Sequence, residues 1–142
     1  MKILIINGVN LNLTGKREKS VYGSKTLEEI NTEIQSYCDK NADVVTFYQS
    51  NIEGEIVNKL HEAFLTQSVD AIILNAGAFT HYSYAIRDAI ASINIPVAEV
   101  HISNVHARED FRKQSVLSSV CKGVVLGFGV GSYIGAIEAL RR

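Results

Sequence analysis

The stretch Pro96-Val97-Ala98-Glu99-Val100-His101-Ile102-Ser103 organises the rest of the chain. Its small and apolar residues predict a short β-strand that is buried on both faces. Because side chains alternate along a strand, Glu99 and His101 point to the same face. A buried carboxylate needs a partner, and a carboxylate behind an imidazole is an arrangement used for proton transfer. The alternative interpretation is a Glu–His pair that only stabilises the strand end.

The composition is that of one globular domain covering residues 1–142, with 46% hydrophobic and 20% charged residues. A formal net charge of −1 provides no basic field for nucleic acid or an anionic membrane, so we expect neither partner. No apolar run approaches the roughly 20 residues of a membrane span, and Ile3–Ile6 is too short for a signal peptide. Cys38 and Cys121 lack the spacing of a disulfide framework or a metal site. We therefore expect a cytoplasmic protein.

Patterns typical of strands and of helices alternate five times along the chain. Strands are expected at 2–6, 43–48, 69–74, 96–103 and 123–128. Helices are expected from 27 on, after a capping box that Thr26 begins, at 53–67, 83–92 and 131–142, and as a short element within 104–120. This alternation predicts an α/β, flavodoxin-like three-layer sandwich around a five-stranded parallel sheet of order 2-1-3-4-5. Residues 9–25 match neither pattern, and we expect a flexible loop there that covers a site.

Ligands bind such sheets beyond the carboxyl ends of the strands, where the strand order reverses. Polar residues occupy those positions in this sequence: Asn7 and Asn10 after the first strand, Asn75 and His81 after the third, and Glu99, His101 and Ser103 on the fourth. The sequence therefore predicts a functional site at this edge of the sheet.

Other kinds of site fit the sequence less well. His81, His101 and Glu99 are possible zinc ligands, but their separation matches no compact metal motif. The glycines at 127, 129 and 131 resemble a nucleotide-binding fingerprint, yet they follow the last strand and no ribose-binding acid comes after them. The chain also lacks the aspartate cluster of a phosphoacceptor domain and the Gly-x-Ser-x-Gly motif of a serine hydrolase.

Acid–base chemistry without a cofactor remains. Arg17 and Tyr22 share the 9–25 loop, and Arg108 and Arg112 stand four residues apart, on one face of the expected short helix. Free tyrosine has a pKa of about 10, and cations nearby favour its phenolate, which is a base. The alternative is that these residues are ordinary solvated side chains.

Five blocks of sequence carry a resemblance to a known family. They are residues 7–17 (NGVNLNLTGKR) followed by Tyr22-Gly23, 49–55 (QSNIEGE), 75–81 (NAGAFTH), 85–88 (AIRD) and 99–112 (EVHISNVHAREDFR). In this order they resemble the type II 3-dehydroquinate dehydratases, and the resemblance covers essentially the whole chain. It implies a hydro-lyase that converts 3-dehydroquinate to 3-dehydroshikimate by trans-dehydration through an enolate, with no cofactor or metal, in the shikimate pathway of aromatic amino-acid biosynthesis.

The resemblance also implies the catalytic roles. Tyr22, as phenolate, removes a proton from the carbon next to the ketone, and Arg17 with Arg112 near it keeps the phenolate ionised. A water held by Asn10 stabilises the enolate. His101 then protonates the departing hydroxyl while Glu99 orients it.

The substrate contacts are implied in the same way, at Asn75, His81, Arg112 and the backbone of Ile102 and Ser103. Asp88 resembles a family residue that reaches into a neighbouring subunit's site, and family members are commonly dodecamers built of trimers. The rival hypothesis from another class is a non-catalytic flavodoxin-like module that binds a small carboxylate or nucleotide.

Four positions depart from the usual family pattern. Ala76 and Lys19 stand where proline is frequent, Phe79 where tyrosine is common, and Ile52 where histidine is frequent. Without the prolines the two turns are expected to be looser. Phe79 lacks a hydroxyl that would bond within the site, so we expect an effect on substrate affinity.

Overall fold

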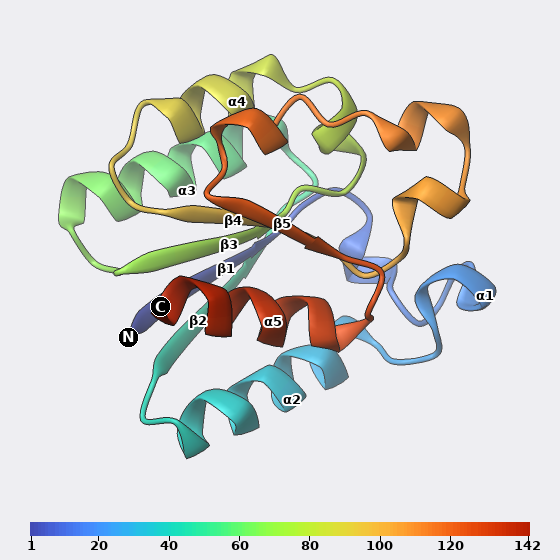
Figure 1. The fold of residues 1–142 in the computed structure, drawn as a ribbon, viewed down its shortest axis with the longest axis horizontal. Coiled ribbons are helices and arrows are strands. Elements are labelled where there is room, and N and C mark those ends of the chain that lie inside the picture. Colours follow the sequence, from blue (N-terminus) through green and yellow to red (C-terminus); the bar gives the residue numbers. More distant parts are fainter.

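The computed structural model describes residues 1–142 and contains a five-stranded sheet with helices on both of its faces (Figure 1). The strands are β1 (Lys2–Asn7), β2 (Val44–Gln49), β3 (Ala71–Asn75), β4 (Val97–His101) and β5 (Gly123–Leu126). All neighbouring pairs are parallel, and the order across the sheet is β2-β1-β3-β4-β5. The predicted fold class and strand order are confirmed.

Four longer helices and one single-turn helix surround the sheet. They are α1 (Lys19–Tyr22), α2 (Leu27–Lys40), α3 (Glu53–Thr66), α4 (Tyr84–Ala91) and α5 (Val130–Arg141). The predicted capping box opens α2: the hydroxyl of Thr26 accepts the amide of Glu29, and the Glu29 carboxylate accepts the amide of Thr26. None of these helices combines the length and the apolar character that crossing a membrane requires.

Each face of the sheet has its own buried core. In β1, Ile3 and Ile5 pack toward α2 and α5, whereas Leu4 and Ile6 pack toward α3 and α4. The same division is visible in Figure 1, where α2 and α5 lie on one side of the sheet and α3 and α4 on the other. A strand covered on both faces has to be apolar at consecutive positions, which is why the central strands β1 and β3 are continuous apolar runs rather than alternating ones.

Two connections differ from the sequence-based expectation. The 9–25 stretch is not wholly irregular, because it holds a 3-10 helix at Leu11–Leu13 as well as α1. The stretch 104–120 is not a short helix but a chain of three 3-10 helices, Val105–Ala107, Asp110–Lys113 and Ser118–Val120. Side-chain oxygens accept hydrogen bonds from backbone amides there. For example, Asn104 Oδ1 accepts the amide of His106 at 3.1 Å. Such local bonds compete with the regular hydrogen bonding of an α-helix.

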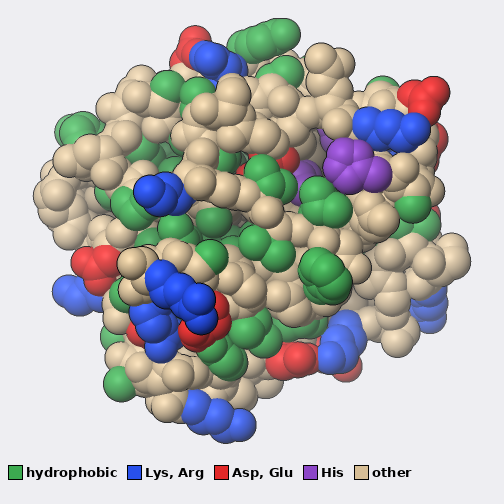
Figure 2. Space-filling view, in the orientation of Figure 1, with side chains coloured by type: hydrophobic (Ala, Val, Ile, Leu, Met, Phe, Trp, Pro, Cys, Tyr) green, Lys and Arg blue, Asp and Glu red, His purple; other side chains and the backbone are tan.

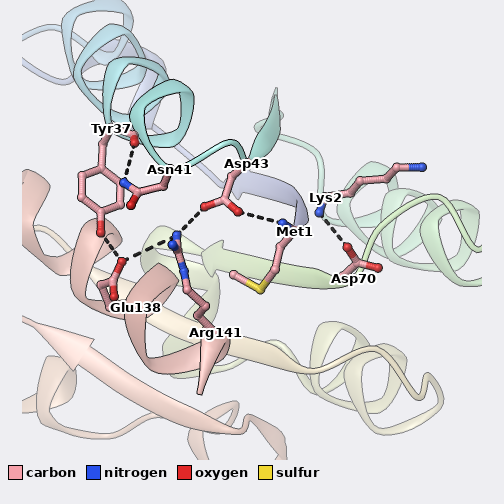
Figure 3. A network of polar contacts seen from close by, with 8 residues as sticks. All are labelled: Met1, Lys2, Tyr37, Asn41, Asp43, Asp70, Glu138 and Arg141. Atoms are coloured by element: carbon pink, nitrogen blue, oxygen red, sulfur yellow. Dashed lines mark hydrogen bonds and ion pairs between the residues drawn. The ribbon is translucent and has the colours of Figure 1, made fainter.

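A polar network closes the sheet at the amino ends of its strands, away from the predicted site (Figure 3). The buried carboxylate of Asp43 binds the amino group of Met1 at 2.7 Å and also pairs with Arg141 of α5. Tyr37 of α2 donates to Glu138 of α5, which lies 3.6 Å from Arg141. These contacts fix α2 and α5 to the amino ends of β1 and β2.

At the opposite edge of the sheet, the ends of β1 and β3 come into direct contact. The amide of Gly8 donates to the carbonyl of Asn75 at 2.7 Å. A methyl group on Gly8 would overlap the backbone of Ala76, so this close approach of two strand ends requires a residue without a side chain.

We therefore expect Gly8→Ala to lower the free energy of unfolding by about 1–3 kcal/mol, because the two strand ends are forced apart. The matched control is Gly54→Ala in α3, where an added methyl group meets nothing within 4 Å. Gly54→Ala should leave stability unchanged or raise it by up to about 1 kcal/mol. Urea unfolding of both variants measures the difference, and equal stabilities would contradict the close-approach explanation.

Candidate active site

Residues of three segments line one pocket at the carboxyl ends of the strands. The segments are 9–22, 75–81 and 101–112, and they lie at or after the ends of β1, β3 and β4. Its lining residues are Val9, Asn10, Leu11, Arg17, Tyr22, Asn75, Gly77, Ala78, His81, His101, Ile102, Ser103, Val105, Arg108 and Arg112. The pocket lies beyond β1, β3 and β4, at the point where the strand order reverses. Ten of the residues that the sequence singled out are therefore brought together: Asn10, Arg17, Tyr22, Asn75, His81, His101, Ile102, Ser103, Arg108 and Arg112.

The phenol of Tyr22 lies between two guanidinium groups. Arg108 Nη1 donates to the Tyr22 hydroxyl at 2.8 Å, and the Cζ atoms of Arg17 and Arg108 each lie 5.0 Å from the centre of the ring. Glu18 contacts the same cations from the more exposed side, at 3.1 Å from Arg17 and 4.0 Å from Arg108. A negative charge on the Tyr22 oxygen would therefore face two adjacent positive charges.

Arg112, which was expected near this phenol, has another partner. Its Nε donates to Glu109 at 3.0 Å, and its Nη2 lies 3.0 Å from the same carboxylate oxygen. The predicted shared helix face of Arg108 and Arg112 does not form, because Arg108 lies between two 3-10 helices and Arg112 lies within the second. Arg108 is the arginine that bonds Tyr22, and it also donates to the hydroxyl of Ser103 at 3.3 Å.

The predicted pair of Glu99 and His101 forms at the end of β4. His101 Nε2 lies 2.7 Å from Glu99 Oε1, and both residues are buried, with 7% and 1% of their surface exposed. Because an ionised carboxylate can only accept, Nε2 carries the hydrogen of this bond. The other ring nitrogen, Nδ1, is the one left for a ligand in the pocket that His101 lines.

Glu99 is held in its ionised form although it is almost fully buried. Burial by itself would raise the pKa of this carboxyl, but hydrogen bonds from His101, Ser118 and Ser115 and the charge on His101 outweigh it and lower the pKa. The two serine hydroxyls both donate to Oε2, at 2.5 Å from Ser118 and 3.0 Å from Ser115. No local pattern in the sequence pointed to these serines, which lie in the irregular segment after β4.

Asn75 is fixed by a buried chain of hydrogen bonds that reaches the last helix. The amide of Gly77 donates to Asn75 Oδ1 at 3.3 Å, so the amide group of Asn75 turns its Nδ2 toward Tyr133. Nδ2 donates to the Tyr133 hydroxyl at 2.9 Å, and that hydroxyl donates to Asn7 Oδ1 at 2.6 Å. Tyr133 is completely buried, and burial strongly raises the pKa of its phenol, so the hydroxyl stays protonated and acts as the donor.

The orientation of His81 is fixed by a backbone carbonyl. His81 Nδ1 donates to the carbonyl of Gln114 at 2.8 Å, so Nε2 of the neutral ring is an acceptor. The ring of Phe111 packs edge-on against it, with the ring centres 5.6 Å apart. No group of three or more His, Cys, Asp or Glu side chains is placed to share a metal ion.

Several residues singled out from the sequence lie outside the pocket. Asp88 is an exposed residue of α4 that pairs with its neighbour Arg87 at 2.9 Å. The four departures from the family pattern, at 19, 52, 76 and 79, do not line the pocket either. Phe79 is buried in the core beneath α3 and α4.

Comparison with known proteins assigns the chain to a family. A model of the family described as "Dehydroquinase class II" matches residues 1–141. The 3-dehydroquinate dehydratase of Caldicellulosiruptor bescii is 54% identical over 140 residues, which cover 99% of this chain and 96% of that protein. The enzyme of the same name from Caldanaerobacter subterraneus subsp. tengcongensis is 56% identical, covering 99% of this chain and 93% of the relative.

The fold is shared as closely as the sequence. The crystal structure of type II dehydroquinase from Butyrivibrio crossotus superposes with a TM-score of 0.97 at 50% identity, covering 100% of this chain and 98% of that one. The two chains therefore share one fold over their whole length.

The buried chain through Tyr133 leads to a stability prediction. Tyr133→Phe should lower the free energy of unfolding by about 1–3 kcal/mol, because it leaves the buried polar atoms of Asn7 and Asn75 without their shared partner. The control is Tyr82→Phe, which removes a hydroxyl from a ring that is 59% exposed and should change stability by less than about 0.5 kcal/mol. Guanidinium unfolding of the two variants tests this, and similar losses in both would refute the role of the buried chain.

Proposed function

The chain belongs to the class II dehydroquinase family, and we propose that it is a 3-dehydroquinate dehydratase, a hydro-lyase that converts 3-dehydroquinate to 3-dehydroshikimate in aromatic amino-acid biosynthesis. The observation that carries the proposal is a phenol flanked by two guanidinium groups in the same pocket as an imidazole backed by a carboxylate. This pairing supplies a base and an acid without any further group. The names of the relatives support the choice of substrate.

Tyr22 acts as the base. Its phenolate takes the proton from the carbon next to the substrate ketone, and the electron pair moves onto the ketone oxygen to form an enolate. Arg108, which bonds the hydroxyl at 2.8 Å, and Arg17, whose guanidinium lies 5.0 Å from the ring centre, stabilise the phenolate. Asn10, which also lines the pocket, holds a water that donates to the enolate oxygen.

His101 acts as the acid. The enolate collapses to the ketone, the carbon–oxygen bond breaks, and the departing hydroxyl takes a proton from His101 Nδ1 to leave as water. The hydrogen bond to Glu99 at 2.7 Å keeps Nε2 protonated and Nδ1 toward the substrate, and the carboxylate charge stabilises the imidazolium that this step requires.

The remaining residues of the pocket bind the substrate. The Asn75 amide, the acceptor nitrogen of His81 and the backbone of Ile102 and Ser103 hold the hydroxyls and the carboxylate, and Arg112 adds a positive charge at the same rim. The segment 9–25, which carries Arg17 and Tyr22, is mobile and closes over the bound substrate.

Self-association is part of the proposal. Apolar side chains on the outer surface support it, among them Val124 of β5 at 40% exposed and Phe128 at 75% exposed. Figure 2 shows several hydrophobic side chains gathered over the middle of the face that it presents. Following the family resemblance, we propose a dodecamer built of trimers in which Asp88 of one subunit reaches the site of the next. Sedimentation equilibrium of the purified protein measures the number of subunits.

The two free cysteines agree with a cytoplasmic location.

Conversion of 3-dehydroquinate forms a conjugated enone, so turnover is followed as a rise in ultraviolet absorbance. In this assay we expect Tyr22→Phe to lower kcat by about 100-fold or more with KM changed by less than about threefold, because the ring remains and only the base is removed. Tyr82→Phe, an exposed ring outside the pocket, is the control and should retain the parent kcat. Near-parent turnover of Tyr22→Phe would remove this tyrosine from the base role, and an inactive parent would favour the binding module.

The acid step has its own signature. In His101→Ala the enolate forms but the hydroxyl does not leave, so we expect the substrate's α-proton to exchange with heavy water while net dehydration falls by about 100-fold or more. Proton NMR of the substrate measures the exchange, and His61→Ala on the exposed side of α3 serves as the control. If exchange and dehydration disappear together, His101 is not the acid of this reaction.

A further inference from the structure

The carboxylate behind His101 has a second set of donors that no step of the proposed mechanism uses. Glu99 Oε1 faces His101, whereas Oε2 accepts one hydroxyl from Ser118 at 2.5 Å and another from Ser115 at 3.0 Å. All three partners converge on a group that is 1% exposed. The two serines come from the segment after β4 and lie 16 and 19 positions beyond the glutamate in the sequence.

The direction of the Ser115 hydroxyl is fixed by its other bonds. Its oxygen accepts the backbone amides of Leu117 and Ser118, each at 3.1 Å, so both of its lone pairs are engaged. The single hydrogen of this hydroxyl is then free only for Glu99. Ser118 has no other side-chain bond in the structure, and its hydroxyl is directed at Glu99 alone.

We propose that Ser115 and Ser118 are positioning residues for the proton donor: by holding Glu99 Oε2 they aim Oε1 at His101 and keep the carboxylate charged. This inference rests on the proposed function, in which Glu99 acts through His101. The same two bonds tie the segment that carries Arg108 and Arg112 to β4. The strand that holds His101, the proposed acid, is therefore fixed to the segment whose Arg108 bonds Tyr22, the proposed base.

The charged surroundings of Glu99 are otherwise sparse. On β4 the only titratable group facing it is His101, and the charged or titratable residues that line the adjoining cavity with it are His106, Arg112 and Lys113. The other titratable neighbour is Cys121. Burial and the charge of Glu99 raise the pKa of its thiol to about 12, so the thiol stays neutral. Burial would raise the pKa of Glu99, and the bonds from His101 and the two serines lower it instead.

The decisive variant is Ser118→Ala, because Ser115 also holds backbone amides and Ser118 does not. We expect kcat to fall about 10-fold, since hydrogen bonds to charged groups are worth about that factor or more, while KM changes less than twofold. Ser118→Thr keeps the hydroxyl and should restore kcat to within about threefold of the parent. The matched control is Ser119→Ala, an exposed neighbour in the same 3-10 helix, which should behave as the parent.

A second measurement reports on the carboxylate itself without turnover. A group whose pKa is lowered on folding adds stability above its unfolded pKa of about 4.3, and this stability is lost as the pH falls through the folded value. Ser118→Ala should therefore have a lower Tm than the parent at neutral pH, and the gap should shrink as the pH is lowered past 4. Ser118→Cys, which replaces the hydroxyl by a weak donor of similar shape, should show the same trend if the alanine variant is too unstable.

The outcomes separate this inference from the proposed function. A parent enzyme without dehydration activity refutes the function, while the Tm comparison still reports whether the hydroxyl holds the charge. An active parent whose Ser118→Ala variant keeps kcat within twofold overturns the positioning role, whatever the Tm. Failure of Ser118→Thr to restore kcat overturns it as well, because the hydroxyl would then not be the cause.

Discussion

A negative charge buried at the carboxyl end of β4 has to be matched by donors, and much of the surrounding structure follows from this requirement. Glu99 receives three of them, one from its own strand and two from the segment that returns toward β5. Removing a charge from water is costly unless every lone pair is used. The returning segment therefore has to stay close to the strand, which fixes the position of the arginines that precede the two serines.

The parallel sheet places this charge at the carboxyl ends of the strands, next to the pocket that His101 lines. All five strands end at the same edge, and the opposite edge is closed by the network of Asp43, Arg141 and the amino group of Met1. Because helices cover both faces, the strand interiors carry almost no polar groups, and polar side chains gather at the ends. The close approach of Gly8 to Asn75 then brings the β1 and β3 ends near enough to line one pocket.

Regular patterns made the fold predictable, whereas the site was predictable only in part. Strand order, the covering of both faces and the pairing of Glu99 with His101 followed from periodicity and alternation, which act over a few residues. The bond from Arg108 to Tyr22 did not, because it joins residues 86 positions apart, and Arg108 lies between 3-10 helices that periodicity did not predict. The bonds of Ser118 and Tyr133 join residues 19 to 126 positions apart, and no local pattern encodes such contacts.

The segment from 105 to 120 connects the surroundings of Tyr22 with those of the Glu99–His101 pair. Near its beginning, Arg108 bonds the phenol of Tyr22, and near its end Ser118 bonds the carboxylate behind His101. A shift of this segment would weaken the bond from Arg108 to Tyr22 and the bond from Ser118 to Glu99 at once. Since 3-10 turns have poorer hydrogen bonding than an α-helix, the segment depends on these side-chain bonds for its position. The proposed base and the proposed acid are therefore coupled through one stretch of backbone, although Tyr22 and His101 lie 79 positions apart in the sequence.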